Sequence, residues 1–170
     1  MELSKKERLI LVNQLLIIEK LYPEEASHYA RHRQALEEGY ELHYGWIYER
    51  LWDGLSKEEC RKVLDILDMY RALSMVEKAL ADKEFEGKYW LRFKGFDGNN
   101  ESEYLAYSRY FIVDLGRFDE LRYGQAVPDF NSHLPSMPKY SAMLDEWDRL
   151  GRSFNLTVGD AVDILSAKAE

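Results

Sequence analysis

The first candidates for chemistry are His28 and His32, which stand four residues apart. On a helix this spacing places both imidazoles on one face, as in helical zinc motifs. The zinc-peptidase motif also requires a glutamate directly after the first histidine, whereas Tyr29 stands there, and Arg31 and Arg33 flank the second. Catalytic zinc needs a third protein ligand, which the sequence does not identify. We therefore expect no bound metal and no cofactor. A metal-dependent hydrolase that uses His28 and His32 remains an alternative hypothesis.

The single cysteine, Cys60, stands in the first turn of an expected helix, a position that can make a thiol nucleophilic. It also lies on the same side as Val63 and Leu67, and free cysteines are commonly buried among apolar residues. No P-loop, dinucleotide-binding glycine pattern or nucleophile elbow occurs in the sequence. The sequence thus predicts no catalytic residue, and we expect a protein that is not an enzyme.

A possible binding site surrounds the glycine-rich turn after Phe93. The turn contains Asp97 and precedes an expected helix start, and helix N-termini attract anions. Arg92 stands just before it, while Tyr104 and Tyr107 offer hydroxyl groups from the following helix. These five residues form the candidate site for a small anionic ligand. The alternative is a tight turn packed under aromatic rings, because Gly-Asp turns need no ligand to form.

The residues from 4 to 21 predict a helix with an unusual surface. Ser4 and Glu7 have capping-box spacing, and the helix that they open is apolar all round between residues 9 and 18, except at Asn13 and Gln14. Two amides on such a helix could fix its register or the oligomer, as single buried asparagines do in coiled coils. They could instead line a polar pocket. We favour the structural role.

The remaining elements are also expected to be helical. Helices are predicted over residues 24–40, 46–52, 57–81, 101–115, 137–150 and 157–168. The alternation over residues 89–94 indicates at most one short extended segment, and a long loop covers 116–138. The predicted fold is all-α: a single compact multi-helix domain over residues 1–170.

Charge and hydropathy exclude other classes of protein. The net charge is −8 and no large cluster of lysines and arginines occurs, which disfavours nucleic-acid binding. The longest apolar stretch, residues 9–18, is shorter than the roughly 20 residues that span a bilayer. The charged N-terminal residues do not form a signal peptide. We therefore expect a cytoplasmic protein without a nucleic-acid or membrane partner.

Two helices are predicted to be apolar on nearly every side: residues 4–21 and the second half of 57–81. Surrounding both within one small domain is difficult, and soluble monomers rarely leave large apolar patches exposed. We therefore expect a homo-oligomer, a dimer or higher. In the alternative, the loop 116–138 folds back over the second of these helices.

Several short segments, in their order and spacing, resemble the YfbU family. They are Arg8-Leu9-Ile10-Leu11 with Asn13-Gln14, Glu38-Gly39-Tyr40, Cys60-Arg61, Asp65-Ile66, Met69-Tyr70 with Ala72-Leu73, Gly95-Phe96-Asp97, Tyr104-Leu105 with Tyr107, Phe130-Asn131, and Lys139-Tyr140 with Met143-Leu144. The resemblance runs along nearly the whole chain. It implies an α-helical, cytoplasmic, bacterial protein, and it supplies neither an enzymatic activity nor catalytic residues.

Some members of this family carry the domain beside a helix-turn-helix domain, which implies a ligand-sensing or interaction role. This chain starts directly with the YfbU-like residues, which weakens a transcriptional interpretation. The leading hypothesis is a non-enzymatic helical domain that self-associates and binds a small ligand or a protein partner. A nucleic-acid-associated regulator remains an alternative that the negative charge disfavours.

Overall fold

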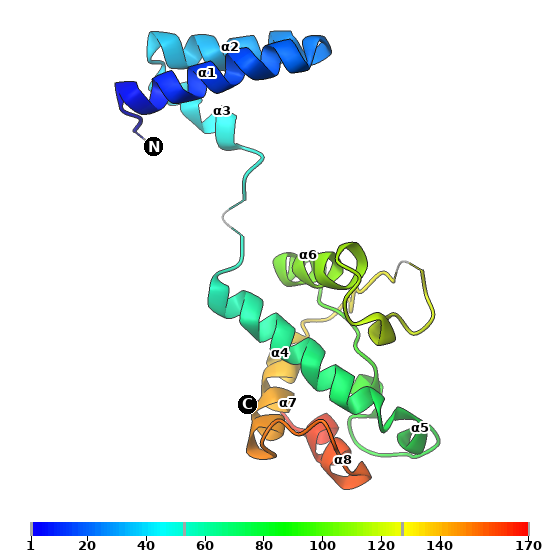
Figure 1. Cartoon of the computed structure of the whole chain (residues 1–170). Helices are drawn as coiled ribbons and strands as arrows, with labels where there is room; N and C mark the ends of the chain where they lie inside the picture. The colour runs from blue at the N-terminus through cyan, green and yellow to red at the C-terminus, as the bar shows by residue number, and fades with distance from the viewer. Residues whose placement is uncertain (1, 53, 127, 170) are drawn as a thin grey trace. The chain divides into compact units, whose positions relative to one another are not determined.

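The computed structural model describes residues 2–52, 54–126 and 128–169, and in these ranges the chain is all-α as predicted. No β-strand occurs in these ranges, where a single isolated bridge joins Phe96 to Asn131. The chain divides into two compact units, residues 1–53 and 54–170 (Figure 1). A single domain over residues 1–170 stays a prediction.

The first unit is a pair of helices, α1 (Lys5–Leu21) and α2 (Ala26–Glu38), that lie side by side (Figure 1). The predicted capping box opens α1: the Ser4 hydroxyl accepts a hydrogen bond from the Glu7 amide, and the Glu7 carboxylate accepts one from the Ser4 amide. The short 3-10 turns η1 (Pro23–Glu25) and η2 (Glu41–His43) precede α2 and α3 (Tyr44–Tyr48).

The C-terminus of α2 is held by a side chain from α1. Gly39 ends α2 with a left-handed φ of 76°, and Arg8 Nη1 donates a hydrogen bond of 2.9 Å to the carbonyl of Leu36. A Cβ atom on Gly39 would lie 2.7 Å from that same Arg8 nitrogen. A salt bridge of 2.7 Å between Arg33 and Glu19 also joins the two helices. Arg8 and Gly39, which are far apart in the sequence, therefore meet at the end of α2.

The second unit contains the other five helices of the described ranges. They are α4 (Lys57–Ser74), α5 (Glu77–Leu80), α6 (Ser102–Arg109), α7 (Met137–Arg149) and α8 (Val158–Ser166), with 3-10 turns η3 (Lys88–Leu91) and η5 (Asp119–Arg122) and a π-helical turn η4 (Tyr110–Asp114) after α6. Two more capping boxes, at Ser56 and Thr157, open α4 and α8. A single helix is predicted over residues 57–81, but in the structure α4 ends at Ser74 and α5 begins at Glu77. At the end of α4 the Ser74 hydroxyl donates a hydrogen bond to the carbonyl of Arg71.

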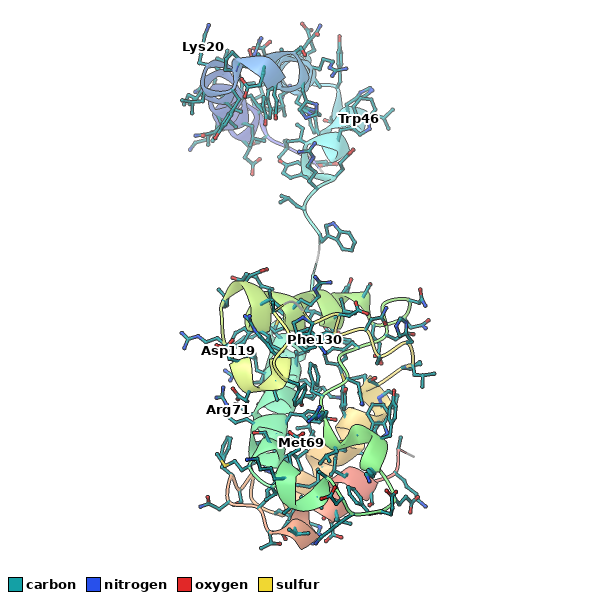
Figure 2. The ribbon with its side chains drawn as sticks, turned by 90° about the vertical axis from the view of Figure 1, so that its right-hand side faces the viewer. Lys20, Trp46, Met69, Arg71, Asp119 and Phe130 are labelled. Carbon is teal, nitrogen blue, oxygen red and sulfur yellow. The ribbon has the colours of Figure 1, made fainter. Side chains whose placement is uncertain are left out.

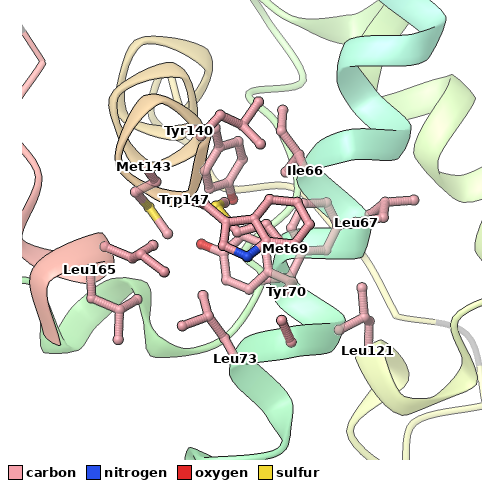
Figure 3. Close-up of a cluster of buried hydrophobic side chains, with 14 of the residues drawn as sticks. Ile66, Leu67, Met69, Tyr70, Leu73, Leu121, Tyr140, Met143, Trp147 and Leu165 are labelled. Atoms are coloured by element: carbon pink, nitrogen blue, oxygen red, sulfur yellow. The ribbon is translucent and has the colours of Figure 1, made fainter. Parts of the chain in front are cut away.

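The core of the second unit is built around α4. Tyr70 and Leu73 of α4 pack with Tyr140 and Trp147 of α7 and with Leu165 of α8, and all five side chains are buried (Figure 3). The apolar second half of α4 is thus central to this unit. Met69, Ala72 and Leu73 are fully buried within the one chain, whereas Met75, directly after α4, is 66% exposed.

The loop from 116 to 138 supplies part of that cover. Leu121 and Phe118 are buried in the same cluster as α4, and Arg71 of α4 stacks over the Phe118 ring at 3.9 Å. Arg71 Nε also donates to Glu120 at 2.5 Å. In the structure the loop folds back on the second apolar helix, as in the alternative given above. The apolar residues of α4 therefore no longer argue for an oligomer.

Residues 89–94, over which at most one short extended segment is predicted, begin as the 3-10 turn η3, and the chain becomes extended only at Arg92. Beyond it, Gly95 has φ of 80°, and the chain crosses residues 130–132. The Phe96 amide donates to the Phe130 carbonyl at 3.0 Å, and the Ser132 amide donates to the Phe96 carbonyl at 3.1 Å. This crossing ties the turn to the end of the long loop.

Candidate functional site

A groove of about 750 Å³ lies in the first unit. It runs between α1 and α2 and extends to the residues of η2 and α3; Figure 2 labels Trp46, which lines it from α3. Its lining consists of Leu11, Gln14, Leu15, Ile18, His28, Tyr29, Arg31, His32, Gln34, Ala35, Tyr40, His43, Trp46, Ile47, Glu49 and Arg50. A volume of this size lies within the range of about 300–1,000 Å³ that is typical of small-molecule sites.

The base of the groove is apolar. Leu15 and Ala35 are buried, and Leu11, Ile18 and Ile47 are half-buried. The spacing of Leu11, Leu15 and Ile18 places these residues on one face of α1, as expected from 3.6 residues per turn. The base of the groove is therefore a hydrophobic surface formed mainly by α1 and α2, which are joined by the contacts of Arg8 and Arg33.

His28 and His32 lie together on the wall that α2 contributes. Their Nε2 atoms are 3.3 Å apart, and their rings meet edge to face with centroids separated by 4.6 Å. Burial lowers the pKa of His32, and the neighbouring His28 and Arg31 lower it further. An added positive charge on His32 is therefore disfavoured where the ring stands.

The same distance bears on the metal hypothesis. Two nitrogen ligands of one tetrahedral zinc lie about 3.3 Å apart, given Zn–N bonds of roughly 2.0–2.1 Å. In residues 2–52, 54–126 and 128–169, however, no group of three or more His, Cys, Asp or Glu side chains is placed to hold a metal ion. The pair therefore has the spacing of two zinc ligands without the third protein ligand that catalytic zinc sites use.

A third histidine, His43, lines the groove from η2. Its ring meets Trp46 edge to face at 4.4 Å and lies 6.4 Å from the ring of Tyr40. Its Nδ1 atom is buried and has no hydrogen-bond partner among the described residues. This nitrogen is therefore an exception to the rule that buried polar atoms are paired, and it lies beneath the groove surface rather than on it.

The charges of the groove are unevenly distributed. Arg31 and Arg50 are its exposed cationic lining residues, and Glu49 is the carboxylate that lines it. The groove therefore carries a positive balance even though the chain as a whole has a net charge of −8.

The two amides singled out in the sequence lie on different sides of α1. Both Asn13 and Gln14 are exposed within the first unit, and their role in fixing register or an oligomer stays a prediction. Gln14 lines the groove, whereas Asn13 lies between Leu9, Leu16 and Ile17 on the outer face of the helix.

The five residues of the predicted anion site are not gathered around one hollow. Arg92 extends over the Tyr123 ring at 4.9 Å and donates to Glu77 at 2.6 Å, beyond the C-terminal end of α4. Phe93 is buried in the core, and its amide donates to the Tyr123 hydroxyl at 2.8 Å. The side chain of Phe93 thus serves the packing of the second unit.

The tyrosines of the predicted site lie at the other end of α4. The Tyr104 hydroxyl donates to Glu59 at 3.2 Å, and the pKa of Tyr107 is raised by burial and by Cys60 beside it. Both partners belong to the first turn of α4, and that helix is roughly 27 Å long at 1.5 Å per residue. Arg92 and Tyr107 are therefore held at opposite ends of α4.

Asp97 is buried and acts within its own turn. Its carboxylate accepts hydrogen bonds from the Asn99 amide at 3.2 Å and from the Asn100 side chain, and these bonds lower the pKa of Asp97. Glu101, also buried, accepts from the amides of Ser136 and Met137 and so satisfies the N-terminus of α7. The geometry of this turn agrees with the alternative given for it, a tight turn packed under aromatic rings; anion binding there stays untested.

Sequence reasoning identified His28 and His32 but missed the groove to which they belong. Tyr40 and Trp46 fall within the helices predicted over residues 24–40 and 46–52, whereas α2 ends at Glu38 and α3 covers Tyr44–Tyr48, so the turn that brings η2 and α3 against α2 could not be read from the sequence. The signal that was available is the density of ring side chains between residues 40 and 48.

Comparison with known proteins shows which family the chain belongs to. Residues 1–167 match the YfbU domain family. The chain is also similar to the UPF0304 protein MJECS11 of Methanocaldococcus jannaschii, with 38% identity over 169 residues, which is 97% of this chain and 99% of that protein. This relative is archaeal, so the bacterial origin that the resemblance implies stays a prediction. Among the described residues, no helix has the length and hydropathy needed to cross a membrane.

Proposed function

The chain belongs to the YfbU family, and from this premise we propose that it is a non-enzymatic helical protein that self-associates through the outer face of α1. The occupant of that face is a second copy of the same chain. The observation that carries the proposal is a row of large apolar side chains that the first unit leaves uncovered.

The outer face of α1 is formed by Leu9, Ile10, Leu16 and Ile17, with Asn13 at its centre. Within the first unit Leu9 is 60% exposed, Ile17 is 54% exposed and Leu16 is 42% exposed. Each buried leucine or isoleucine side chain stabilises an assembly by about 1.5–3 kcal/mol relative to its exposed state. A partner that covers this face would therefore gain several such contributions.

The first unit also has little core of its own. Its buried cluster consists of Val12, Leu15, Leu36 and Tyr44. Domains of this size bury only about 60% of their unfolded surface and are marginally stable unless something else supports them. A covering surface would supply the apolar contacts that the unit lacks.

The spacing on the outer face fits a helix pair. Leu9, Asn13 and Leu16 are separated by four and three residues, which is the alternation of the d, a and d positions of a heptad. A polar asparagine at one a position is the feature that fixes register and the number of strands in coiled coils. Asn13 is also the middle residue of α1 (Lys5–Leu21), so in a two-fold pair centred there it would meet its own copy.

The test is the mass of the full chain by equilibrium sedimentation at micromolar concentration. We expect Leu9→Glu to weaken self-association by at least about tenfold, because it places a charge in the apolar seam. Leu134→Glu is the matched control, since Leu134 is 56% exposed in the second unit, close to the 60% of Leu9. A mass unchanged by Leu9→Glu, or lowered equally by both variants, contradicts the proposal.

Asn13→Leu tests the role of the amide. Removing the one polar group of the seam should leave the chain associated but broaden the distribution of masses, because the asparagine then no longer selects one arrangement. An unchanged single mass would show that Asn13 lies outside the interface.

A further inference from the structure

We propose that the groove between α1, α2 and α3 binds a single-chain amphiphile with a carboxylate head group. This inference goes beyond self-association and names the chemical class of ligand for a site that has no assigned role. The groove joins an apolar base to a cationic, imidazole-bearing rim, and each part corresponds to one part of such a molecule.

The apolar base suits an alkyl chain. Leu15 and Ala35 are buried beneath it, and Leu11, Ile18 and Ile47 are half-buried around it. A flexible hydrocarbon chain gains free energy in proportion to the apolar area that it buries, at roughly 25 cal/mol per Å². The volume of about 750 Å³ is large enough for such a chain together with a polar end.

The rim suits an anionic head. Arg31 and Arg50 lie there with a single lining carboxylate, Glu49. Guanidinium groups form paired hydrogen bonds with carboxylates, which favours this head group over a cationic or an uncharged one. An imidazole N–H of the His28–His32 pair on the same wall can donate a further hydrogen bond.

Three of the four histidines line this groove, His28 and His32 from α2 and His43 from η2, where the His43 ring lies against Trp46. They place imidazole rings on the wall of the groove beside its two arginines, whereas His133 belongs to the second unit.

A second copy on the outer face of α1 would leave the groove open. At 100° per residue, Leu11, Leu15 and Ile18 point to the side of the helix away from Leu9 and Asn13. Ligand binding and self-association are therefore independent, and the failure of one does not remove the other.

Binding of a carboxylate should be linked to proton uptake. The charged groups that act on His32 are Arg31 and His28 on α2 and Glu49 after α3, while α1 contributes only uncharged lining residues. A carboxylate beside the pair adds a negative charge that favours the protonated imidazole. Affinity should then rise as the pH falls through the histidine range.

The test is isothermal titration of the full chain with dodecanoate, below its micelle concentration, in buffers of different ionisation enthalpy. We expect saturable binding with net proton uptake near neutral pH. His32→Gln should abolish the uptake, and Arg31→Gln combined with Arg50→Gln should weaken binding at least about tenfold, as loss of charged hydrogen bonds implies. His133→Gln, outside the groove, should change neither quantity.

Two further measurements keep the result open to refutation. Dodecanamide, the uncharged analogue, should bind at least about tenfold more weakly; equal affinity would mean that the groove accepts amphiphiles without recognising a carboxylate, and the proposal would be wrong. Photo-crosslinking with a diazirine-labelled dodecanoate should label peptides within residues 11–50. Labelling confined to the second unit also overturns the proposal, and so does an absence of binding to the assembled protein. The sedimentation result for Leu9→Glu tests self-association separately and does not depend on these outcomes.

Discussion

Replacing Gly95 by alanine should destabilise the second unit strongly. Gly95 has φ of 80°, a conformation that costs a non-glycine residue about 1–2 kcal/mol. Its ideal Cβ atom would also lie 1.8 Å from the Phe130 carbonyl oxygen, closer than any real contact allows. The backbone of the loop would have to move, because the obstacle is main chain rather than a flexible side chain.

The magnitude follows from what that movement would break. The crossing depends on the Phe96 amide bonded to Phe130 and the Ser132 amide bonded to Phe96, at 3.0 and 3.1 Å. Each bond contributes roughly 0.5–1.5 kcal/mol. Together with the strain at φ, the expected loss is about 2–5 kcal/mol for Gly95→Ala.

Gly124→Ala is the matched control. Gly124 also has φ of 80°, but nothing lies within 4 Å of its ideal Cβ atom, so only the strain of about 1–2 kcal/mol applies. The assay is urea unfolding of both variants, followed by tryptophan fluorescence, in which Trp147 reports on the core. Equal losses for the two variants would refute the close approach of residue 95 to the loop.

Three further predictions concern other parts of the chain. Arg8→Met should lower the protection of the last α2 amides from hydrogen exchange and cost about 1 kcal/mol, because its hydrogen bond to the α2 C-terminus is lost; Lys5→Met, an exposed change on the same helix, should not. The pKa of Glu59 is lowered from its ordinary value of 4.5 by hydrogen bonds from Ser56, so its contribution to stability is full above that value and is lost as the pH falls through the folded-state pKa. Glu59→Gln should therefore be less stable than the wild type at neutral pH and equally stable in acid, as measured by urea unfolding; a constant difference would contradict this. Elemental analysis should find no stoichiometric zinc or other transition metal, and one metal per chain that disappears in His32→Ala would overturn this.

The starts of α1, α4 and α8 could be predicted because each has a local signal. Three capping boxes, at Ser4, Ser56 and Thr157, open helices where the sequence indicates them. The break after Ser74 had no such signal, because the apolar pattern continues through Met75 and Val76 while the backbone turns. Helix ends set by packing leave little trace in periodicity.

The candidate sites were harder to predict because they depend on contacts between distant segments. Arg92 and Tyr107 are close in sequence, yet α4 separates their partners, Glu77 and Cys60. Conversely, His32 and Trp46 meet in one groove only because the chain turns after Gly39. Spacing along a helix placed His28 beside His32 correctly, while nothing local could place η2 and α3 against α2.

The expected homo-oligomer was inferred from two helices with apolar residues on nearly every side. In the structure Leu121 and Phe118 of the long loop cover one of them, α4. The outer face of α1, with Leu9 and Leu16, is what remains for a second copy. The proposal therefore rests on one helix and can be tested at one place.

Light scattering of the unmodified chain across micromolar concentrations is the most direct test of self-association. The chain mass is 20.1 kDa. If the chain forms a two-fold pair, the measured mass should approach twice that value as the concentration rises. A mass that stays near 20.1 kDa on concentration would show that the chain covers α1 without a second copy, and the proposed interface would be wrong.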